Sequence, residues 1–213
     1  PEQIAALEKN RVNKRYLPGI SLPENLRFSA DPSQAASGAE LVISVIPTQH
    51  LRGVLEQFED VLPGTMPVVS ASKGLEVETF QPPTKIITDV LGVRPLCVLT
   101  GPSHAEEVAR GLPASLVACS TDNAVAEQVQ AALSCESLRV YTNPDPVGAE
   151  FAAALKNVIA IGAGICDGLS LGDNAKAALI TRGVVEIARF GNRHGAQPET
   201  FFGLAGIGDL MTT

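Results

Sequence analysis

The sequence has few basic residues, and this shortage argues against one large class of partners. Its 213 residues include 16 Lys and Arg against 23 Asp and Glu, which gives a formal net charge of −7 at pH 7. A nucleic-acid surface needs clustered Lys and Arg side chains. We therefore expect no nucleic-acid partner, and an anionic ligand would have to be bound by local positive groups.

Long apolar runs are also missing. No segment reaches the roughly 18 uninterrupted apolar residues of a membrane span, although hydrophobic residues make up 45% of the chain. The sequence contains no segment of the signal-peptide type either. With an ordinary 18% of charged residues, this composition predicts a globular cytoplasmic protein without a membrane span.

The few cysteines and histidines lack the spacing of a metal site. The cysteines form no C-x-x-C pair and the histidines form no H-x-x-x-H pair. We therefore expect reduced thiols, no disulfide framework and no metal. The residues concerned are Cys97, Cys119, Cys135, Cys166, His50, His104 and His194.

Short apolar runs alternate with helical patterns from residue 41 to about residue 142. This alternation predicts a doubly wound parallel sheet whose strands are buried on both faces. The expected strands are 41–46, 67–71, 96–100, 115–119 and 138–142, with one more short strand near 26–29. The expected helices are 1–10, 49–58, 82–91, 103–110 and 122–133.

The pattern changes after the segment Asn143-Pro144-Asp145-Pro146. Strands cease there and Ala- and Gly-rich helices follow, so we divide the chain into an α/β unit over 1–145 and the start of an all-α unit over 146–213. Two helices are expected over 147–164 and 174–190, the second capped by Asp173 and ended by Gly191. A short third helix opens at 199–202, and we expect it to be poorly supported.

One lysine stands out in the segment 148–173. On a helix, Lys156 shares its face with very small residues that let another backbone approach closely. Packing of that face would desolvate the ammonium and lower its pKa, making Lys156 a proton acceptor near neutral pH. A solvated surface lysine is the alternative. The small residues are Ala149, Ala152, Ala153, Ala160, Ala163 and Gly164.

Polar residues also follow the expected strands 67–71 and 96–100. Lys73 comes directly after the first and the Gly101-Pro102-Ser103 turn after the second, and open α/β sheets bind ligands at the carboxyl ends of parallel strands. Ser103 and Glu106 have the spacing of a capping box. Ser103 can therefore be a helix cap, a residue lining the ligand crevice, or both.

Asp209 is a carboxylate in the otherwise apolar loop GLAGIGDL. A buried acid needs a partner. If Lys73 and Lys156 approach each other, each lowers the pKa of the other by like-charge repulsion, which favours a neutral base. The charged residues of 173–193 are interpreted as cap, surface or interface groups.

Four blocks carry a family resemblance: SKGLE at 72–76, GPSHAEEVARGLP at 101–113, ALKNVIAIGAGICDGLSLGDNAKAALITRG around Lys156, and GLAGIGDLMTT at 203–213. In this order and spacing, they resemble the NAD(P)-dependent glycerol-3-phosphate dehydrogenases along almost the whole chain. The resemblance implies an incomplete Rossmann-like sheet followed by a helical domain, with NAD or NADP as cofactor. It also implies reversible reduction of dihydroxyacetone phosphate to sn-glycerol 3-phosphate, which supplies glycerophospholipid synthesis. A homodimer stays open, as does the choice between NAD and NADP.

The resemblance also implies roles for single residues. Lys156 would be the catalytic base or acid, and His104, which replaces a more usual aromatic residue, would be packed and non-catalytic. The implied substrate-binding residues are Lys73, Gly101, Ser103, Lys156, Asn157, Asp209 and Thr213. The implied cofactor-binding residues are Tyr16 in NKRYLPG, Lys73 and Ala105.

Two parts of the family pattern have no counterpart in these 213 residues. They are the G-x-G-x-x-G turn for the cofactor pyrophosphate and the Ser-Arg-Asn segment with its phosphate-binding arginine. We therefore expect an internal piece of a longer enzyme, inactive by itself and weak in cofactor binding. The alternatives are a catalytically silent fragment and a two-domain dehydrogenase of the hydroxyacid or phosphogluconate type. The K-G-L-E, G-P-S and G-D-L blocks argue against the second.

Overall fold

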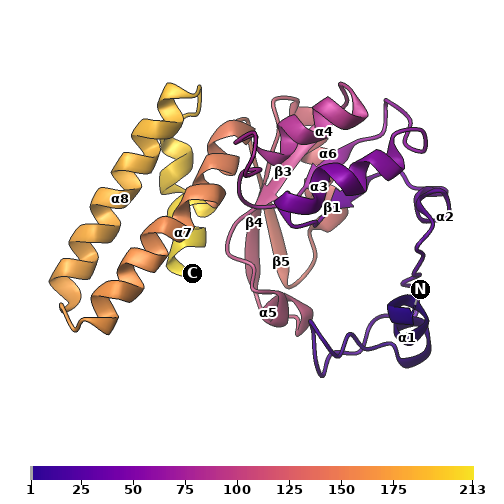
Figure 1. Cartoon of the computed structure of the whole chain (residues 1–213), viewed down its shortest axis with the longest axis horizontal. Helices are drawn as coiled ribbons and strands as arrows, with labels where there is room; N and C mark the ends of the chain where they lie inside the picture. Colours follow the sequence, from indigo (N-terminus) through magenta and orange to yellow (C-terminus); the bar gives the residue numbers. More distant parts are fainter. Residues whose placement is uncertain (1) are drawn as a thin grey trace.

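The chain folds around a five-stranded sheet. The structure, a computed structural model, describes residues 2–213, and the strands lie in the order of the sequence, β1-β2-β3-β4-β5 (Figure 1). Each expected strand from residue 41 onward is present within two residues of its predicted ends. The strands are β1 (Val42–Ser44), β2 (Val68–Ser70), β3 (Leu96–Thr100), β4 (Ala114–Cys119) and β5 (Leu138–Asn143).

One pair of strands departs from the expected parallel arrangement. β1, β2 and β3 are parallel, as are β4 and β5, but β4 runs antiparallel to β3, with Thr100 opposite Val117. The connection between them contains only the five-residue helix α5 (Ala105–Ala109). Such a helix spans about 7 Å, whereas β3 is about 16 Å long. The connection therefore stays at one edge of the sheet and β4 returns from there.

Helices cover both faces of the sheet. α3 (Thr48–Leu55) and α4 (Pro83–Leu91) pack against the face that carries Val68, with a 3₁₀ turn, η1 (Glu56–Phe58), after α3. α6 (Asn123–Leu133) covers the face that carries Val69. Successive residues of a strand point to opposite faces, so β2 contributes to both cores. The central strands are buried as expected, but the edge strands β1 and β5 are exposed in part.

The segment before β1 lies apart from the helical end of the chain (Figure 1). It contains α1 (Glu2–Asn10) and α2 (Pro32–Ala36). The strand expected near 26–29 is wrong, because that segment has no neighbouring strand and the carbonyl of Leu26 accepts a hydrogen bond from the Arg11 guanidinium at 2.9 Å instead. The only described β-pairing there is an isolated bridge between Val12 and Ser21.

Beyond β5 the described chain is helical. α7 (Pro146–Gly168) and α8 (Asp173–Arg193) form a hairpin beside the sheet (Figure 1). They are followed by a 3₁₀ turn, η2 (Pro198–Phe202), a π turn, η3 (Leu204–Gly208), and the short α9 (Asp209–Met211). α7 is longer than predicted at both ends. The Asp145 carboxylate caps it by accepting a hydrogen bond from the backbone N–H of Gly148 at 2.8 Å.

The predicted ends of α8 are wrong for identifiable reasons. Gly172 occupies the capping position and Asp173 lies in the first turn. The helix continues through Gly191, where the missing side chain makes room for a ring, because a Cβ there would lie 2.2 Å from Cζ of Phe201. Phe201 is only 1% exposed, so the segment 198–202 is well supported, contrary to expectation.

α7 packs against the sheet through its first half. Ala149 contacts the cluster formed by Val98, Val117 and Cys119. Glu150, one residue further on, accepts hydrogen bonds from the backbone N–H and the hydroxyl of Thr84 at 2.8 and 2.6 Å. Among residues 2–213, α7 is the one helix long and apolar enough to cross a membrane. The first half of α7 makes the contacts of a core helix.

Burial raises the pKa of Glu150 to about 7. An unfolded glutamate titrates near about 4.3, so the folded state binds the proton more tightly. The ionised carboxyl therefore costs stability, and this cost grows as the pH rises from about 4 to about 7.

We predict that Glu150→Gln, which removes this cost, raises the free energy of unfolding at pH 8 by up to about 3 kcal/mol and changes it little at pH 4. Urea unfolding of both proteins between pH 4 and pH 8 measures the difference. Glu40→Gln is the control, since Glu40 is exposed. A difference that does not vary with pH would contradict the role assigned to burial.

Candidate active site

Lys156 is buried where α7 faces the end of the described chain. The residue is 8% exposed, and its Nζ lies 2.7 Å from Oδ1 of Asp209. The same ammonium donates a hydrogen bond to Oγ1 of Thr213 at 2.7 Å. Lys156 is therefore a desolvated and fully engaged lysine, as the small-residue face of the helix predicted, and the alternative of a solvated surface lysine is excluded.

Asp209 is held between two lysines. Its side chain is 3% exposed and binds Lys156 through Oδ1, while Oδ2 lies 2.8 Å from Nζ of Lys73. Lys73 belongs to the loop after β2 and its side chain is one-third exposed. Three distant segments of the chain thus meet at one carboxylate.

A tight approach of backbones brings Asp209 to this position. The π turn η3 packs Ala205 against Ala149 and the sheet. Gly206 faces the backbone of η2, and a Cβ there would lie 2.1 Å from the carbonyl oxygen of Phe201. The glycine-rich sequence before Asp209 is therefore required for close packing.

Two hydroxyls fix the turn that carries Asp209. The hydroxyls of Thr213 and Thr212 donate hydrogen bonds to the carbonyl oxygen of Asp209 at 2.7 and 3.0 Å. Thr213 thus accepts from Lys156 and donates to Asp209, so one hydroxyl links the lysine to the backbone beside the carboxylate.

The electrostatics of the cluster favour a lysine that can lose its proton. Burial lowers the pKa of Lys156, the hydrogen bond to Asp209 opposes this shift, and the positive charge of Lys73 lowers the pKa further. With two ammonium groups and one carboxylate, the charged cluster carries one excess positive charge. Lys156 can therefore exchange a proton with a ligand, and the cluster can attract an anion.

The structure brings four of the predicted site residues together: Lys73, Lys156, Asp209 and Thr213. Asn157 follows Lys156 on α7 but is exposed, and Ala105 is the exposed first residue of α5. Tyr16 is 61% exposed in the N-terminal segment, where the guanidinium of Arg15 lies over its ring. These three residues lie outside the cluster.

Gly101 and Ser103 follow β3, at the edge of the sheet predicted from the sequence. Gly101 has φ +131°, and a Cβ would lie 3.1 Å from the carbonyl oxygen of Ser115. The capping box is wrong, because α5 begins two residues later than expected, with His104 at its capping position. The hydroxyl of Ser103 donates instead to the carbonyl oxygen of Gly101 at 3.2 Å.

An open groove of about 450 Å³ adjoins this turn. Ser103 and His104 line it together with Arg139 and Thr212. Nε2 of His104 lies 2.7 Å from the carbonyl oxygen of Thr212, so this histidine links the loop after β3 to the turn that carries Asp209. It was expected to be packed, but it is exposed.

Sequence reasoning missed Thr48, Gln49 and Arg52 on α3, which contact the loop carrying Lys73. Thr48 closely follows β1, and the strand-end argument applied to Lys73 would have found it.

The structure has four free cysteines, of which Cys135 is exposed. Within the described range, 2–213, no group of three His, Cys, Asp or Glu side chains is arranged to hold a metal ion.

The fold agrees with comparisons to known proteins. The family described as NAD-dependent glycerol-3-phosphate dehydrogenase matches through its N-terminal part over residues 1–126 and its C-terminal part over residues 145–213. The chain therefore belongs to the NAD-dependent glycerol-3-phosphate dehydrogenase family.

Curated relatives support this assignment. The protein named glycerol-3-phosphate dehydrogenase [NAD(P)+] from Geobacter sulfurreducens is 47% identical over 215 residues, covering all of this chain and 64% of the relative. The protein of the same name from Citrifermentans bemidjiense is 46% identical, with the same coverage. The chain thus spans slightly less than two thirds of the length of these relatives.

The crystal structure of glycerol-3-phosphate dehydrogenase from Coxiella burnetii has the same fold. It superposes with a TM-score of 0.93 at 34% sequence identity, over 99% of this chain and 65% of that one. The mixed sheet and the helical hairpin thus match a solved member of the family.

We predict that Asp209→Asn lowers the free energy of unfolding by about 3 kcal/mol at pH 7, because it leaves a buried ammonium without its counter-ion. The deficit should shrink toward pH 10, since an unpaired buried lysine loses its proton at lower pH than an unfolded one. Urea unfolding at several pH values measures both effects.

Asp167→Asn is the matched control. Asp167 pairs with Lys176 at 2.8 Å, but its side chain is 63% exposed, and such surface pairs contribute about 0 to 1 kcal/mol. Equal losses of unfolding free energy in Asp209→Asn and Asp167→Asn would contradict the role of Asp209 as a buried counter-ion.

Proposed function

We propose that this chain carries the proton-transfer site of an NAD(P)H-dependent dehydrogenase that reduces dihydroxyacetone phosphate to sn-glycerol 3-phosphate. The observation that supports it most is the buried Lys156 ammonium, 2.7 Å from Asp209 and joined to Lys73 through that carboxylate. The names of the curated relatives support the same reaction. A silent fragment would need no such cluster.

Lys73, Ala105 and Tyr16 would hold the nicotinamide cofactor, which would supply the hydride that C2 of the substrate gains in the reduction. As the C2 carbonyl oxygen gains negative charge, the ammonium of Lys156 donates it a proton and becomes a neutral amine. In the oxidation, neutral Lys156 accepts the proton of the C2 hydroxyl. The lowered pKa of Lys156 suits a group that works in both directions.

The excess positive charge of the cluster suits an anionic phosphate ester. Lys73 is one-third exposed and can reach a ligand while it still contacts Asp209. We assign Gly101, Ser103, Asn157 and Thr213 to the substrate side of the site. Thr213 is supported by its direct bond to Lys156, and the others by the family motifs alone.

The cofactor is NAD or NADP in this proposal. Lys73 fits a position beside the nicotinamide, because it is the exposed member of the cationic pair and lies at the carboxyl end of β2. Ala105 and Tyr16 are assigned to the cofactor on the family motifs. Both are exposed and open to a ligand.

The two sequence-predicted units are retained in the proposal. The cofactor would bind the unit over 1–145, and the unit over 146–213 would supply Lys156 and Asp209. The separate family matches at 1–126 and 145–213 support this division. The four free thiols suit the reducing cytoplasm.

The decisive experiment compares two proteins. The first is residues 1–213, and the second, called the extended protein below, adds at both ends the corresponding segments of the Geobacter sulfurreducens relative. Isothermal titration with NADPH and dihydroxyacetone phosphate, followed by a turnover assay, tests the proposal. An extended protein that binds neither ligand would favour the silent fragment, and turnover of a hydroxyacid or phosphogluconate in place of dihydroxyacetone phosphate would favour the other alternative.

We predict that Lys156→Met in the extended protein lowers kcat by about 10³-fold and leaves cofactor affinity nearly unchanged. General acid–base catalysis alone contributes roughly 10²- to 10⁴-fold. Lys176→Met is the control, because Lys176 binds Asp167 on the far part of the hairpin. A Lys156 variant with more than a tenth of normal turnover would refute the assignment.

We also predict that Lys73→Ala raises KM for dihydroxyacetone phosphate. In the oxidation direction, it should also move the rising limb of the plot of kcat/KM against pH to higher pH. Without the charge of Lys73 the pKa of Lys156 rises, so a higher pH is needed to form the neutral base. The measurement is kcat/KM against pH. A raised KM with an unmoved limb would mean that Lys73 binds substrate without tuning Lys156.

A further inference from the structure

The loop after β2 that carries Lys73 has no regular secondary structure of its own. Its position therefore depends on contacts made by its neighbours. At its start, the hydroxyl of Ser72 donates to the carbonyl oxygen of Ile46 at 2.6 Å, and the hydroxyl of Thr48 donates to the carbonyl oxygen of Lys73 at 2.9 Å. The backbone of Lys73 is thus tied to the first residue of α3.

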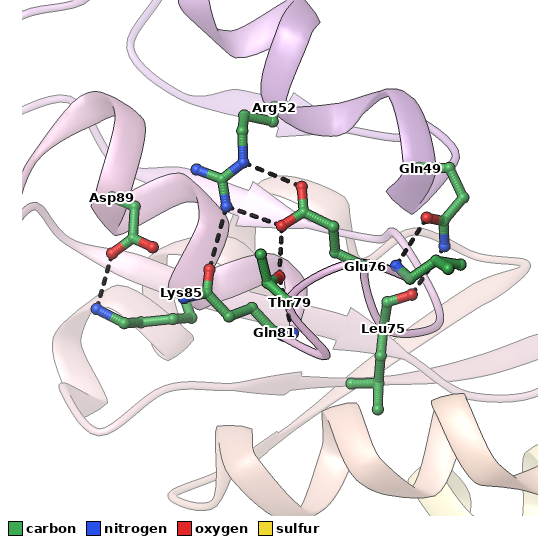
Figure 2. Close-up of polar contacts among 9 residues, drawn as sticks. Gln49, Arg52, Leu75, Glu76, Thr79, Gln81, Lys85 and Asp89 are labelled. Atoms are coloured by element: carbon green, nitrogen blue, oxygen red, sulfur yellow. Dashed lines mark hydrogen bonds and ion pairs between the residues drawn. The ribbon is translucent and has the colours of Figure 1, made fainter.

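The side chain of Gln49 pairs with the loop backbone as another strand would. Its Nε2 donates to the carbonyl oxygen of Leu75 at 2.8 Å, and its Oε1 accepts from the backbone N–H of Val77 at 2.9 Å (Figure 2). Both hydrogen-bonding groups of one amide are used on one loop. This geometry fixes the distance between α3 and the loop.

Arg52, one turn further along α3, closes the far end of the loop. Its Nε and Nη2 donate to the two carboxylate oxygens of Glu76 at 3.0 and 2.9 Å, and Nη2 also donates to Oε1 of Gln81 at 3.1 Å (Figure 2). The hydroxyl of Thr79 donates to Oε2 of Glu76 at 2.5 Å. The Glu76 side chain is only 13% exposed, so this ion pair is less solvated than an ordinary surface pair.

The backbone of 76–81 is closed as well. The N–H of Phe80 donates to the carbonyl oxygen of Glu76 at 2.7 Å, and the N–H of Glu76 donates to that of Gln81 at 3.0 Å. Phe80 has φ +56°, and the residue is 73% exposed. The left-handed backbone conformation of Phe80 is therefore not stabilised by burial of its own side chain, and the contacts of the loop must maintain it.

We propose that Gln49, Arg52 and Glu76 form a latch that positions Lys73 on Asp209. None of the hydrogen bonds and ion pairs of these residues reaches Lys156 or Asp209, so they act on the site through the loop alone. A bidentate Arg–carboxylate pair adds geometric specificity as well as attraction. The inference rests on the proposed function for its kinetic consequence, but its structural consequence stands without it.

The structural test uses residues 1–213. Arg52→Ala should increase the rate of reductive methylation at Lys73, read by mass spectrometry, and should speed hydrogen exchange at the amides of Val77 and Phe80. Lys156 should react as slowly as before. Arg52→Lys keeps the charge without the planar fork and should give most of the same change. Unchanged reactivity of Lys73 in both variants would overturn the proposal.

Lys85→Ala is the matched control. Lys85 forms a nearby ion pair with Asp89 at 2.7 Å on α4 (Figure 2) but its hydrogen bonds do not reach the loop. Its loss should leave Lys73 reactivity and loop exchange unchanged. If Lys85→Ala changed Lys73 reactivity and loop hydrogen exchange as much as Arg52→Ala does, the effect would follow from the loss of any nearby charge, and the latch would be overturned.

The kinetic test uses the extended protein. Arg52→Ala should lower kcat/KM about 10- to 100-fold, since small displacements of positioning groups can have effects of this size, and should move the rising limb in the same direction as Lys73→Ala does. In the Lys73→Ala background, Arg52→Ala should have almost no further effect. Additive effects would overturn the proposal.

The two tests separate two failures. If the extended protein lacks dehydrogenase activity, the proposed function fails while the reactivity of Lys73 still decides the latch. If the extended protein is active and the effects of Arg52→Ala and Lys73→Ala on kcat/KM are additive, the latch fails while the proposed function stands.

Discussion

The carboxylate of Asp209 is the point on which the site depends. The Asp209 side chain is 3% exposed and its carboxylate lies within 2.8 Å of two ammonium groups, so it offsets the repulsion between them and part of the cost of burying Lys156. A buried ion pair with one partner removed is strongly destabilised. The carboxylate therefore links stability to the charge state of Lys156, because the contact that holds three segments together also raises the pKa of Lys156 against the larger lowering effect of burial.

Small residues make that contact possible. Ala149, Ala152 and Ala153 are almost completely buried, and they let the sheet and the following turns lie close to α7. Gly206 allows the backbone before Asp209 to reach that of Phe201. Larger side chains at these positions would push the turn outward and separate the lysine from its partner. The Ala- and Gly-rich composition of this region is thus a requirement of the site, since packed interiors accommodate added atoms poorly.

Local patterns predicted much of the fold and part of the site. The apolar runs identified all five strands, since β-branched residues bounded by Pro and Gly are typical of buried strands. The isolated Lys156 and Asp209 were recognisable because charged residues in apolar surroundings need partners. The antiparallel β4, the start of α5 and the continuation of α8 through Gly191 were not recognisable. Each depends on a distant contact or on the length of a connection, which a local window does not contain.

The sequence by itself determined the five strands of the sheet, the long helices, the family and the residue types available for proton transfer, because these follow from local periodicity and motif spacing. Only the tertiary structure decided that one carboxylate serves both lysines, that Thr213 reaches Lys156, and that α3 holds the loop of Lys73. Lys73 and Asp209 are far apart in sequence, and their 2.8 Å separation is set by the packing of α7 between the sheet and the final turns. Distances of that kind decide pKa values, because charge interactions depend on separation and burial.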